Sequence, residues 1–459
     1  MKLSLERALQ ATGAMLYDGD AAPDAVRIST DTRTMEAGDT FLALHGEHYD
    51  GHDFVGEALA RGAAMLILDR AAARVSGTPT MLVDQTQRAY MALGGAAREL
   101  FGGHVVGITG STGKTTTKAL MAQLLSSRYR DRILAAPANE NNEIGVSKLL
   151  LNASNELHDV LVVEMGARRY GDVASLVEIA RPQLGILTNV GEAHVEIVGS
   201  RERLAETKWA LFARGARAVL NADDEVSCRR SPTLPHPPHW FVALHTDGRM
   251  EDYANCATLT ALIGDRLFHR KGNKTQELTV DVRVPGLHNR SNLAAAIAGA
   301  LELGASLDRI ASDVGQVVLP EGRYDRISVN GLRLIYDAYN ANASGTIAAL
   351  DAFADESGTR RIAVLASMAE LGDESEMLHE RVGEHAARRV DVLLVQGEFA
   401  RALVRGAQRG GLAQERIVDV ATNSHAAAWL REHAGRDDVV LLKGSRKYKL
   451  EEIVEELRA

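Results

Sequence analysis

The sequence has few cysteines and no long apolar run. Only Cys228 and Cys256 occur among 459 residues, which argues against a disulfide scaffold or a cysteine metal cluster and fits a reducing cytoplasm. No apolar run approaches the roughly 20 residues of a membrane-spanning helix, and the N-terminal stretch predicts an amphipathic helix instead of a signal peptide. A formal net charge of −9 argues against wholesale nucleic-acid binding. The composition, 46% apolar and 25% charged, is that of a soluble globular protein.

The length predicts roughly three domains. We expect an N-terminal α/β unit over 1–85, a central unit over 86–317 and a third unit over 318–459. Short apolar runs alternate with helical patterns in the last two units, which predicts parallel, doubly wound sheets. Ligands of such sheets bind beyond the carboxyl ends of the strands. The expected strands are 104–109, 160–163, 184–187 and 218–220 in the central unit, and 333–336, 361–366, 392–395 and 439–442 in the third.

Several further elements have clear sequence signals. Ser4 is a plausible N-cap of a helix over 4–12, and helices are also expected over 53–61, 85–100 and 291–303. Four of the ten prolines fall in 231–239, which predicts a loop. The alternation of apolar and polar residues over 257–284 predicts antiparallel strands appended to the central sheet.

The segment 104–129 has the pattern of a phosphate-binding loop. An expected strand is followed by Gly110, Ser111, Thr112, Gly113, Lys114 and Thr115, and then by a helical pattern from Thr116. Such a turn directs backbone N–H groups at an anion, while Lys114 would reach the outer phosphates and Thr115 would ligate Mg²⁺. Ile108 stands where the general pattern has glycine, which indicates a tighter loop. The alternative is a glycine-rich turn with a surface lysine.

Other charged residues follow the expected strands. Glu164 and His194 come at neighbouring strand ends and could hold a divalent cation, or they could be a helix-capping glutamate and a hydrogen-bonded loop histidine. Lys208, taken alone on a helix, would be a surface charge. Arg323 and Asp337 could each be half of a surface ion pair or reach the γ-phosphate.

Three histidines lie close together near the N-terminus. His45, His48 and His52 span a glycine-rich loop near Asp31 and Arg33. They lack the carboxylate spacing typical of zinc sites, which favours a polar ligand-binding loop or a solvated loop over a metal site.

Taken together, the motifs resemble the Mur ligase family almost from end to end. The segments that carry the resemblance are STDTR and GDTFLALHGEHYDGHDF at 29–54, GITGSTGKTTTK at 107–118, NENNEIG at 139–145, VVEMGA at 162–167, TNVGEAH at 188–194, ETKWALF at 206–212, GLHNRSN at 286–292, EGR at 321–323, YNAN at 339–342, MAELGDES at 368–375 and LLKGSR at 441–446. YNAN and MAELG are the most specific, and they resemble the family members that add D-alanyl-D-alanine.

The resemblance implies a cytoplasmic, monomeric, ADP-forming peptide ligase. Its fold would be a three-domain α/β architecture with a central P-loop ATPase sheet and a C-terminal Rossmann-like domain. It would join D-Ala-D-Ala to UDP-N-acetylmuramoyl-tripeptide in peptidoglycan synthesis. The three domains would bind the UDP-sugar substrate, ATP and the incoming amine, in that order along the chain.

The resemblance also implies residue roles. Lys114 and its loop bind the ATP phosphates, and Lys114, His194, Lys208 and Arg323 are catalytic. Two Mg²⁺ ions are expected, with Thr115, Glu164, His194 and Lys208 as the metal-site residues. Lys208 matches a lysine that CO₂ carbamylates in this family, which makes it an anion. The nucleotide would further contact Asn289, Asn292, Arg323 and Asp337, and the other substrates would contact Asp31, Arg33, Thr40, Gly46, Asn142, Asn340 and Asn342.

The chain departs from the family pattern at four places. Ala343 and Ser147 replace usual prolines, Tyr336 replaces an acidic residue, and Ala366-Ser367-Met368 replaces Gly-Asp-Met. Three of these places lie in the third unit, so a ligase with another amino acid or peptide as acceptor is one alternative. A diamino-acid-adding or folylpolyglutamate-synthase-like ligase is another, which YNAN disfavours. The alternative from a different class is an ATP-binding regulatory module without ligation.

Overall fold

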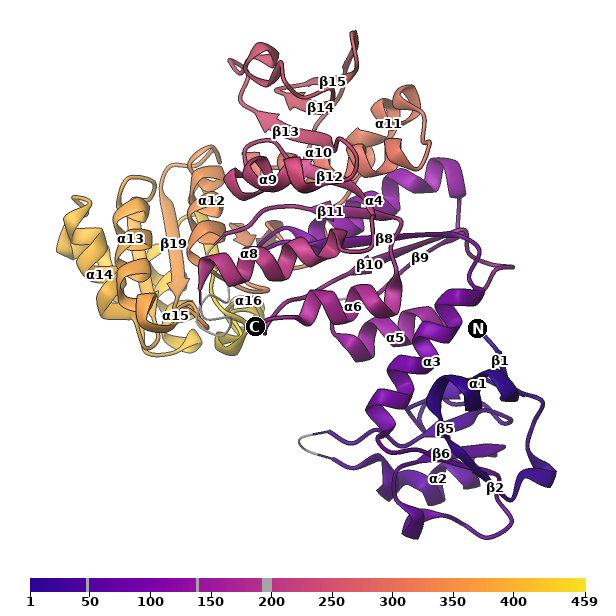
Figure 1. The fold of residues 1–459 in the computed structure, drawn as a ribbon. Coiled ribbons are helices and arrows are strands. Elements are labelled where there is room, and N and C mark those ends of the chain that lie inside the picture. The colour runs from indigo at the N-terminus through magenta and orange to yellow at the C-terminus, as the bar shows by residue number, and fades with distance from the viewer. Residues whose placement is uncertain (47–48, 138–139, 192–199) are drawn as a thin grey trace. The chain divides into compact units, whose positions relative to one another are not determined.

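The computed structural model describes residues 1–46, 49–137, 140–191 and 200–459 (Figure 1). These residues form two compact units. The first consists of Met1–Gly107, Tyr129–Gly166 and Asp172–Gly185, and the second of Ile108–Arg128, Ala167–Gly171 and Ile186–Ala459. No helix in the described ranges combines the length and apolar character that crossing a bilayer requires.

The N-terminal part of the first unit contains a five-stranded sheet of order β2-β7-β6-β5-β4. All its pairs are parallel except β2 with β7. Its core is apolar because Phe41, Leu66 and Leu68 pack together. The elements are β1 Leu3–Ser4, α1 Leu5–Thr12, β2 Met15–Tyr17, β3 Ala25–Val26, β4 Ile28–Ser29, β5 Thr40–Leu42, α2 Val55–Ala60, β6 Met65–Leu68, β7 Thr80–Leu82 and α3 Thr86–Leu100.

The predicted cap of the first helix is confirmed. Ser4 accepts a hydrogen bond from the backbone N–H of Arg7 at 3.2 Å. The helix expected over 53–61 is shorter, because Gly51–Phe54 forms a 3₁₀ turn before α2 begins at Val55.

A nine-stranded sheet has the order β16-β15-β14-β13-β12-β11-β8-β10-β9. Strand β9 pairs in parallel with β10, and β12, β13 and β14 pair in parallel with one another. Strands β14, β15 and β16 form antiparallel hairpins, as the sequence predicts for 257–284. The strands are β8 His104–Thr109, β9 Ile133–Ala135, β10 Val160–Glu164, β11 Leu184–Leu187, β12 Arg217–Asn221, β13 His239–Leu244, β14 Thr258–Ile263, β15 Arg266–Lys271 and β16 Lys274–Thr279.

Helices follow most of these strands. They are α4 Lys114–Tyr129, α5 Glu143–Asn152, α6 Asp172–Ala180, α8 Arg201–Trp209, α9 Glu225–Arg230, α10 Gly286–Glu302 and α11 Leu307–Asp313. The predicted start of α10 at residue 291 is wrong, because the helix begins at Gly286, which adopts a positive φ of 73°. Asn289 and Asn292 therefore lie three residues apart on one face of a helix.

The C-terminal sheet has the order β17-β18-β22-β19-β20-β21, and all its pairs are parallel except β17 with β18. Its elements are β17 Asp325–Val329, β18 Leu332–Tyr336, α12 Ala343–Ala354, β19 Arg361–Ala366, α13 Ser375–Ala387, β20 Val392–Gln396, α14 Ala400–Arg409, β21 Ile417–Asp419, α15 Asn423–His433, β22 Val439–Lys443 and α16 Glu451–Arg458.

Both faces of this C-terminal sheet are buried. On β19, Ala363 and Leu365 belong to one apolar cluster with α12, α13 and α14, while Ile362 and Val364 belong to another with α15 and α16. Alternate residues of one strand thus contact opposite helix layers, which is the doubly wound arrangement that the sequence predicts. The carboxyl ends of β18, β22 and β19 meet at one edge, which brings Asp337, Lys443 and Ser367 there.

Candidate active site

The loop between β8 and α4 approaches its neighbours so closely that only glycine fits at two positions. A Cβ atom at Gly110 would lie 1.9 Å from Oγ1 of Thr188, and one at Gly113 would lie 2.1 Å from Oδ1 of Asn292. Gly113 also has a φ of +81°, a conformation that side chains with a Cβ rarely adopt. The helix begins at Lys114, two residues before the predicted start. The predicted sequence of strand, glycine loop and helix N-terminus is therefore confirmed.

The two residues directly after β11, Thr188 and Asn189, hold this loop in place by hydrogen bonds. Thr188 donates from Oγ1 to the carbonyl of Thr112 at 2.6 Å. The side-chain oxygen of Asn189 accepts from the N–H of Thr112 at 3.1 Å, and its backbone carbonyl accepts from the N–H of Ser111 at 3.0 Å. The sequence analysis assigned Thr188 and Asn189 no contact with the phosphate loop, although both belong to TNVGEAH. Their position directly after a strand was the available signal.

Two lysines lie near this loop. Lys114 donates from Nζ to the carbonyl of Gly110 at 2.8 Å. Lys208, on α8, is only 1% exposed, so the interpretation of Lys208 as a surface charge is wrong. Burial, and then the positive charge of Lys114, lower the pKa of Lys208 well below its usual value. A buried lysine of this kind favours the neutral amine, which is a nucleophile.

Glu164 ends β10 and is buried. Asn141 donates from Nδ2 to Oε1 of Glu164 at 2.9 Å, and the carbonyl of Asn141 accepts from the N–H of Gly166 at 2.8 Å. Asn141 therefore orients the carboxylate, a role that sequence reasoning missed. The predicted substrate residue Asn142 caps α5 by accepting from the N–H of Gly145 at 2.9 Å. His194 lies outside the described residues.

Helix α10 brings the two predicted adenine-site asparagines to the loop region. Both are buried. Asn289 donates from Nδ2 to the carbonyl of Pro285 at 3.1 Å, one turn back. Asn292 packs against Gly113, so α10 and the phosphate loop have a direct contact.

The predicted residues of the third unit lie around the end of β18. Asp337 and Lys443 form a buried ion pair at 2.9 Å, so Asp337 is not part of a surface pair. The guanidinium of Arg323 lies over the ring of Tyr339 at 4.3 Å. Asn340 accepts from the N–H of Ala341, and Asn342 caps α12 by accepting from the N–H of Gly345 at 2.8 Å.

The four predicted uridine-site residues differ in exposure. Asp31 and Arg33 form an ion pair at 2.7 Å, and hydrogen bonds from the Arg33 side chain help to hold the pKa of Asp31 at about 2. The Thr40 side chain is fully buried in β5, with no hydrogen-bond partner for its hydroxyl among the described residues. Gly46 donates its N–H to the carbonyl of Tyr49 at 3.0 Å.

At least one of the three histidines near the N-terminus has a structural role. His52 is 9% exposed, its Nδ1 lies 2.7 Å from a carboxylate oxygen of Asp50, and its Nε2 accepts from the N–H of Asp69 at 3.4 Å. His45 pairs with Asp50 at 3.6 Å, and His48 lies outside the described residues.

Comparison with known proteins gives matches along most of the chain. Three family models match in succession: "Mur ligase family, catalytic domain" at 26–89, "Mur ligase middle domain" at 108–300 and "Mur ligase, glutamate ligase domain" at 322–446. The UDP-N-acetylmuramoyl-tripeptide–D-alanyl-D-alanine ligase of Escherichia coli is 30% identical over 463 residues, covering 100% of this chain and 99% of the relative. The chain belongs to the Mur ligase family.

Other members of the family with the same activity agree with this assignment. The enzyme of Synechocystis is 37% identical over 361 residues, covering 78% of this chain and 75% of its own. The crystal structure of MurF from Acinetobacter baumannii has 27% identity and a TM-score of 0.86, covering 100% and 99% of the two chains. MurF from Thermotoga maritima in complex with ADP has 28% identity and a TM-score of 0.79, covering 94% and 97%. The predicted three-domain Mur ligase fold is confirmed.

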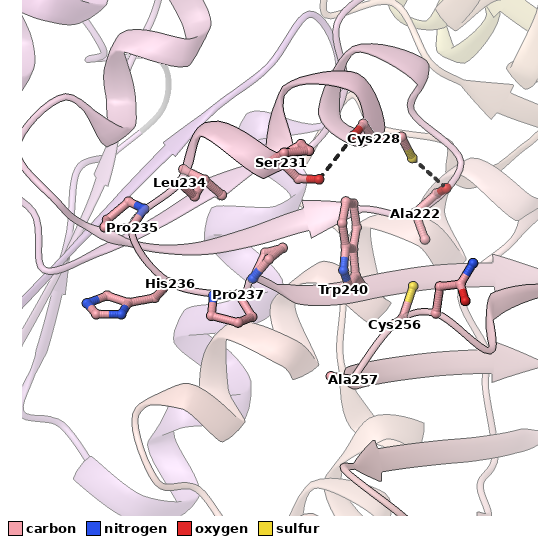
Figure 2. Close-up of a pocket in the computed structure, with 13 residues that line it drawn as sticks. Ala222, Cys228, Ser231, Leu234, Pro235, His236, Pro237, Trp240, Cys256 and Ala257 are labelled. Atoms are coloured by element: carbon pink, nitrogen blue, oxygen red, sulfur yellow. Dashed lines mark hydrogen bonds between the residues drawn. The ribbon is translucent and has the colours of Figure 1, made fainter.

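This Mur ligase also has a pocket that none of the predicted site residues line. It has a volume of about 610 Å³ and lies between the proline-rich loop and the start of β14. Figure 2 shows Trp240, Pro237 and the only two cysteines of the chain, Cys228 and Cys256, around it. Cys228 donates to the carbonyl of Ala222 at 3.3 Å and is exposed. Partial desolvation and the carboxylates of Asp224 and Asp223 raise the pKa of its thiol, and burial raises that of Cys256, which makes both poor nucleophiles.

Proposed function

We propose that this Mur ligase uses ATP to join D-alanyl-D-alanine to UDP-N-acetylmuramoyl-tripeptide, as a cytoplasmic, monomeric enzyme. The observation that carries the proposal is a glycine loop whose close contacts leave no room for a Cβ at two positions, with a buried lysine near it, in a chain that matches D-alanyl-D-alanine ligases over almost its full length.

The chemistry requires activation, because a carboxylate is a poor electrophile. The tripeptide carboxylate attacks the γ-phosphorus of ATP, which gives an acyl phosphate and ADP. The amine of the dipeptide then attacks the acyl carbon and loses a proton, and phosphate leaves as the amide bond forms. The N–H groups of the loop and the ammonium of Lys114 stabilise the charge that develops on the transferred phosphoryl group. Arg323 supplies a second cation from the third domain.

The donor set fits Mg²⁺, which prefers oxygen ligands. Glu164 offers a buried carboxylate that Asn141 orients, and Thr115 offers a hydroxyl in the first turn of α4. We assign both to Mg²⁺, together with His194. A bound ion would neutralise phosphate charge.

Lys208 fits a carbamate. The ammonium first loses a proton, and the neutral nitrogen then attacks the carbon of CO₂. A N–C bond forms as one C=O π bond breaks, and a second proton leaves the nitrogen, so that a cation is replaced by an anion with oxygen atoms that suit a second Mg²⁺. The buried position and the neighbouring charge of Lys114 favour the unprotonated amine that this step needs.

The substrates divide among three domains in this proposal, with boundaries near residues 85 and 317. Asp31, Arg33, Thr40 and Gly46 belong to the uridine site, Asn289 and Asn292 to the adenine site, and Asn142, Asn340 and Asn342 to the peptide sites. Since Thr40 is buried and Asn142 is a helix cap, these two would shape their sites through the backbone.

The departures in the third domain have local structural explanations. Ser367 donates to the carbonyl of Gln396 and accepts from the N–H of Phe399. Tyr336 donates to Glu451 at 3.2 Å. Ala343 is the first residue of α12, where proline and alanine both fit. These contacts favour tolerated variation over a change of acceptor.

The test is phosphate release from ATP with UDP-N-acetylmuramoyl-tripeptide, with and without D-alanyl-D-alanine, with the product identified by mass. We expect release that depends on both substrates and a pentapeptide product. Turnover with another amine but not with this dipeptide would contradict the proposed acceptor.

A further inference from the structure

Lys443, the last residue of β22, makes an unusual set of contacts. Its ammonium lies 2.9 Å from a carboxylate oxygen of Asp337 and donates to two backbone carbonyls, those of Asp337 at 3.1 Å and Asn340 at 3.0 Å. An ammonium has three N–H groups, and three acceptors from one loop surround it. Lys443 belongs to the segment LLKGSR, and the family resemblance gives it no role.

The contacts of Lys443 lie in the interior. Lys443 is 5% exposed and Asp337 is 7% exposed. Neither charge has ready access to water, so each depends on the other for compensation. Because two of the acceptors are backbone carbonyls, the position of Lys443 fixes the path of the chain from Asp337 to Asn340.

The same short loop carries groups that face two substrates in the proposed function. Asp337 begins it and is assigned to the nucleotide. Asn340 and Asn342 follow and are assigned to the acceptor. The loop also reaches Arg323, whose guanidinium lies over the ring of Tyr339, and the N–H of Tyr339 donates to the carbonyl of Gly322 at 3.4 Å.

We propose that Lys443 is a positioning residue that holds the nucleotide-contacting carboxylate of Asp337 and the acceptor-binding loop in one arrangement, so that the two substrates are presented together. This inference rests on the proposed function of Asp337 and Asn340. It assigns Lys443 no contact with a substrate. It predicts that one substitution outside the phosphate loop impairs two substrate sites.

The test is Lys443→Met, which keeps an unbranched chain and removes the ammonium. We expect KM for ATP and KM for the dipeptide to rise together by about 10- to 100-fold, the range typical when a residue that orients a functional group is removed. Lys443→Gln keeps two N–H donors without the charge, so we expect the dipeptide KM to recover more than the ATP KM. If Lys443→Met does not fold, Lys443→Gln decides the question by comparison with the wild type. Both KM values should then be raised, and the KM for ATP should be raised more than the KM for the dipeptide.

A matched control lies at the other end of the same strands. Arg360 pairs with the buried Asp438 at 2.6 Å and donates to the carbonyl of His433, before β19 and β22 begin. Arg360→Met removes a cation from a buried carboxylate in the same sheet. We expect it to lower the melting temperature, with both KM values changed by less than about twofold, as for distant sites.

Two outcomes would overturn the inference. One is a Lys443→Met variant with the stability loss of Arg360→Met and unchanged KM values, which would make Lys443 purely structural. The other is a rise in the ATP KM alone. Affinity for a non-hydrolysable ATP analogue is measured in parallel, because it does not depend on which acceptor the enzyme uses. If the wild-type chain fails to turn over the dipeptide, the proposed function fails, whereas an unchanged analogue affinity in Lys443→Met rejects this inference.

Discussion

At the scale of single residues, Gly113 offers a sharp test of the nucleotide loop. Gly113→Ala should lose affinity for ATP, because the new Cβ would lie 2.1 Å from Oδ1 of Asn292 and displace that side chain from the loop. The positive φ alone should cost stability on the order of 1 kcal/mol. The measurement is binding of an ATP analogue by titration calorimetry, together with thermal unfolding.

Gly215 provides the control for Gly113. Its φ is +76°, close to the +81° of Gly113, and a Cβ there would meet nothing within 4 Å. Gly215→Ala should therefore lose a similar amount of stability and keep its affinity for the analogue. Equal analogue affinities in the two variants would mean that the contact between Gly113 and Asn292 does not shape the site.

Lys208 carries a second prediction at this scale. In the presence of ¹³C-labelled bicarbonate, the wild-type protein should show a carbamate carbon signal by NMR. Lys208→Arg should lack it, because a guanidinium stays protonated in proteins. Depleting CO₂ should lower turnover reversibly in the wild type. Lys274 is exposed, so Lys274→Arg should keep the signal. A signal of equal intensity in Lys208→Arg would place the carbamate elsewhere.

The residues that sequence reasoning found and missed differ in chemistry. Lys114 and Gly113 could be predicted because a phosphate loop combines rare residue types at fixed spacing within one short segment. Asn141 and Lys443 could not, because each acts through a partner that lies 23 or more residues away, whereas Thr188 carried a signal in its position directly after a strand. The predicted Asn142 was one position from the asparagine that contacts Glu164, and nothing local distinguishes the two neighbours.

At the scale of elements, the first turn of α12 separates helix capping from substrate recognition. Asn342→Ala should cost about 1 kcal/mol, because the N–H of Gly345 loses its acceptor, and should also raise KM for the dipeptide. Asn342→Ser keeps a capping oxygen but not the amide, so stability should recover while the dipeptide KM stays high. Denaturant unfolding and initial-rate kinetics provide the two measurements.

The control for this element is the N-cap of α15, a helix that packs on the other face of the same sheet. Thr422 accepts from the N–H of His425 at 3.2 Å, so Thr422→Ala should lose comparable stability with an unchanged KM. If Asn342→Ser restores both stability and KM, Asn342 acts only as a cap, and its assignment to the acceptor site is wrong.

Long, apolar elements could be predicted and short or half-polar ones could not. Strand β19 matched the expected 361–366, because six consecutive residues suit a strand buried on both faces. Strand β21 has three residues, and the start of α10 includes Gly286 and His288, which resemble a loop. The packing of Gly286 against α12, where a Cβ would lie 2.5 Å from that of Ala352, favours the helical start, and no local signal reveals it.

At the scale of the whole chain, family membership could be predicted because the motifs recur from residue 29 to residue 446, and their order constrains the fold more than any one motif. The sequence could not predict how much free energy of folding is lost by burying polar groups in the interior. His288 illustrates this, since it lies in a family motif and yet its Nδ1 is buried without a hydrogen-bond partner among the described residues.

Burial lowers the pKa of His288 to about 4, from an ordinary value near 6.5, and His269 is lowered to about 4 mainly for the same reason. Between these pH values the unfolded chain binds more protons than the folded chain, so stability is full above about pH 6.5 and falls as the pH drops towards 4. For His288 alone the loss from pH 6.5 to pH 4 is on the order of 3 kcal/mol.

His288→Leu should therefore reduce the slope of stability against pH in this window, whatever its effect on stability at pH 7.5. Denaturant midpoints at pH 7.5, 6.5, 5.5 and 4.5 give the slope. His236 lies exposed in the proline-rich loop, and His236→Leu serves as the matched control, with the wild-type slope expected. The interpretation is wrong if His288→Leu and the wild type lose the same free energy of unfolding between pH 6.5 and pH 4.5, because the buried imidazole would then not be the group whose protonation opposes folding.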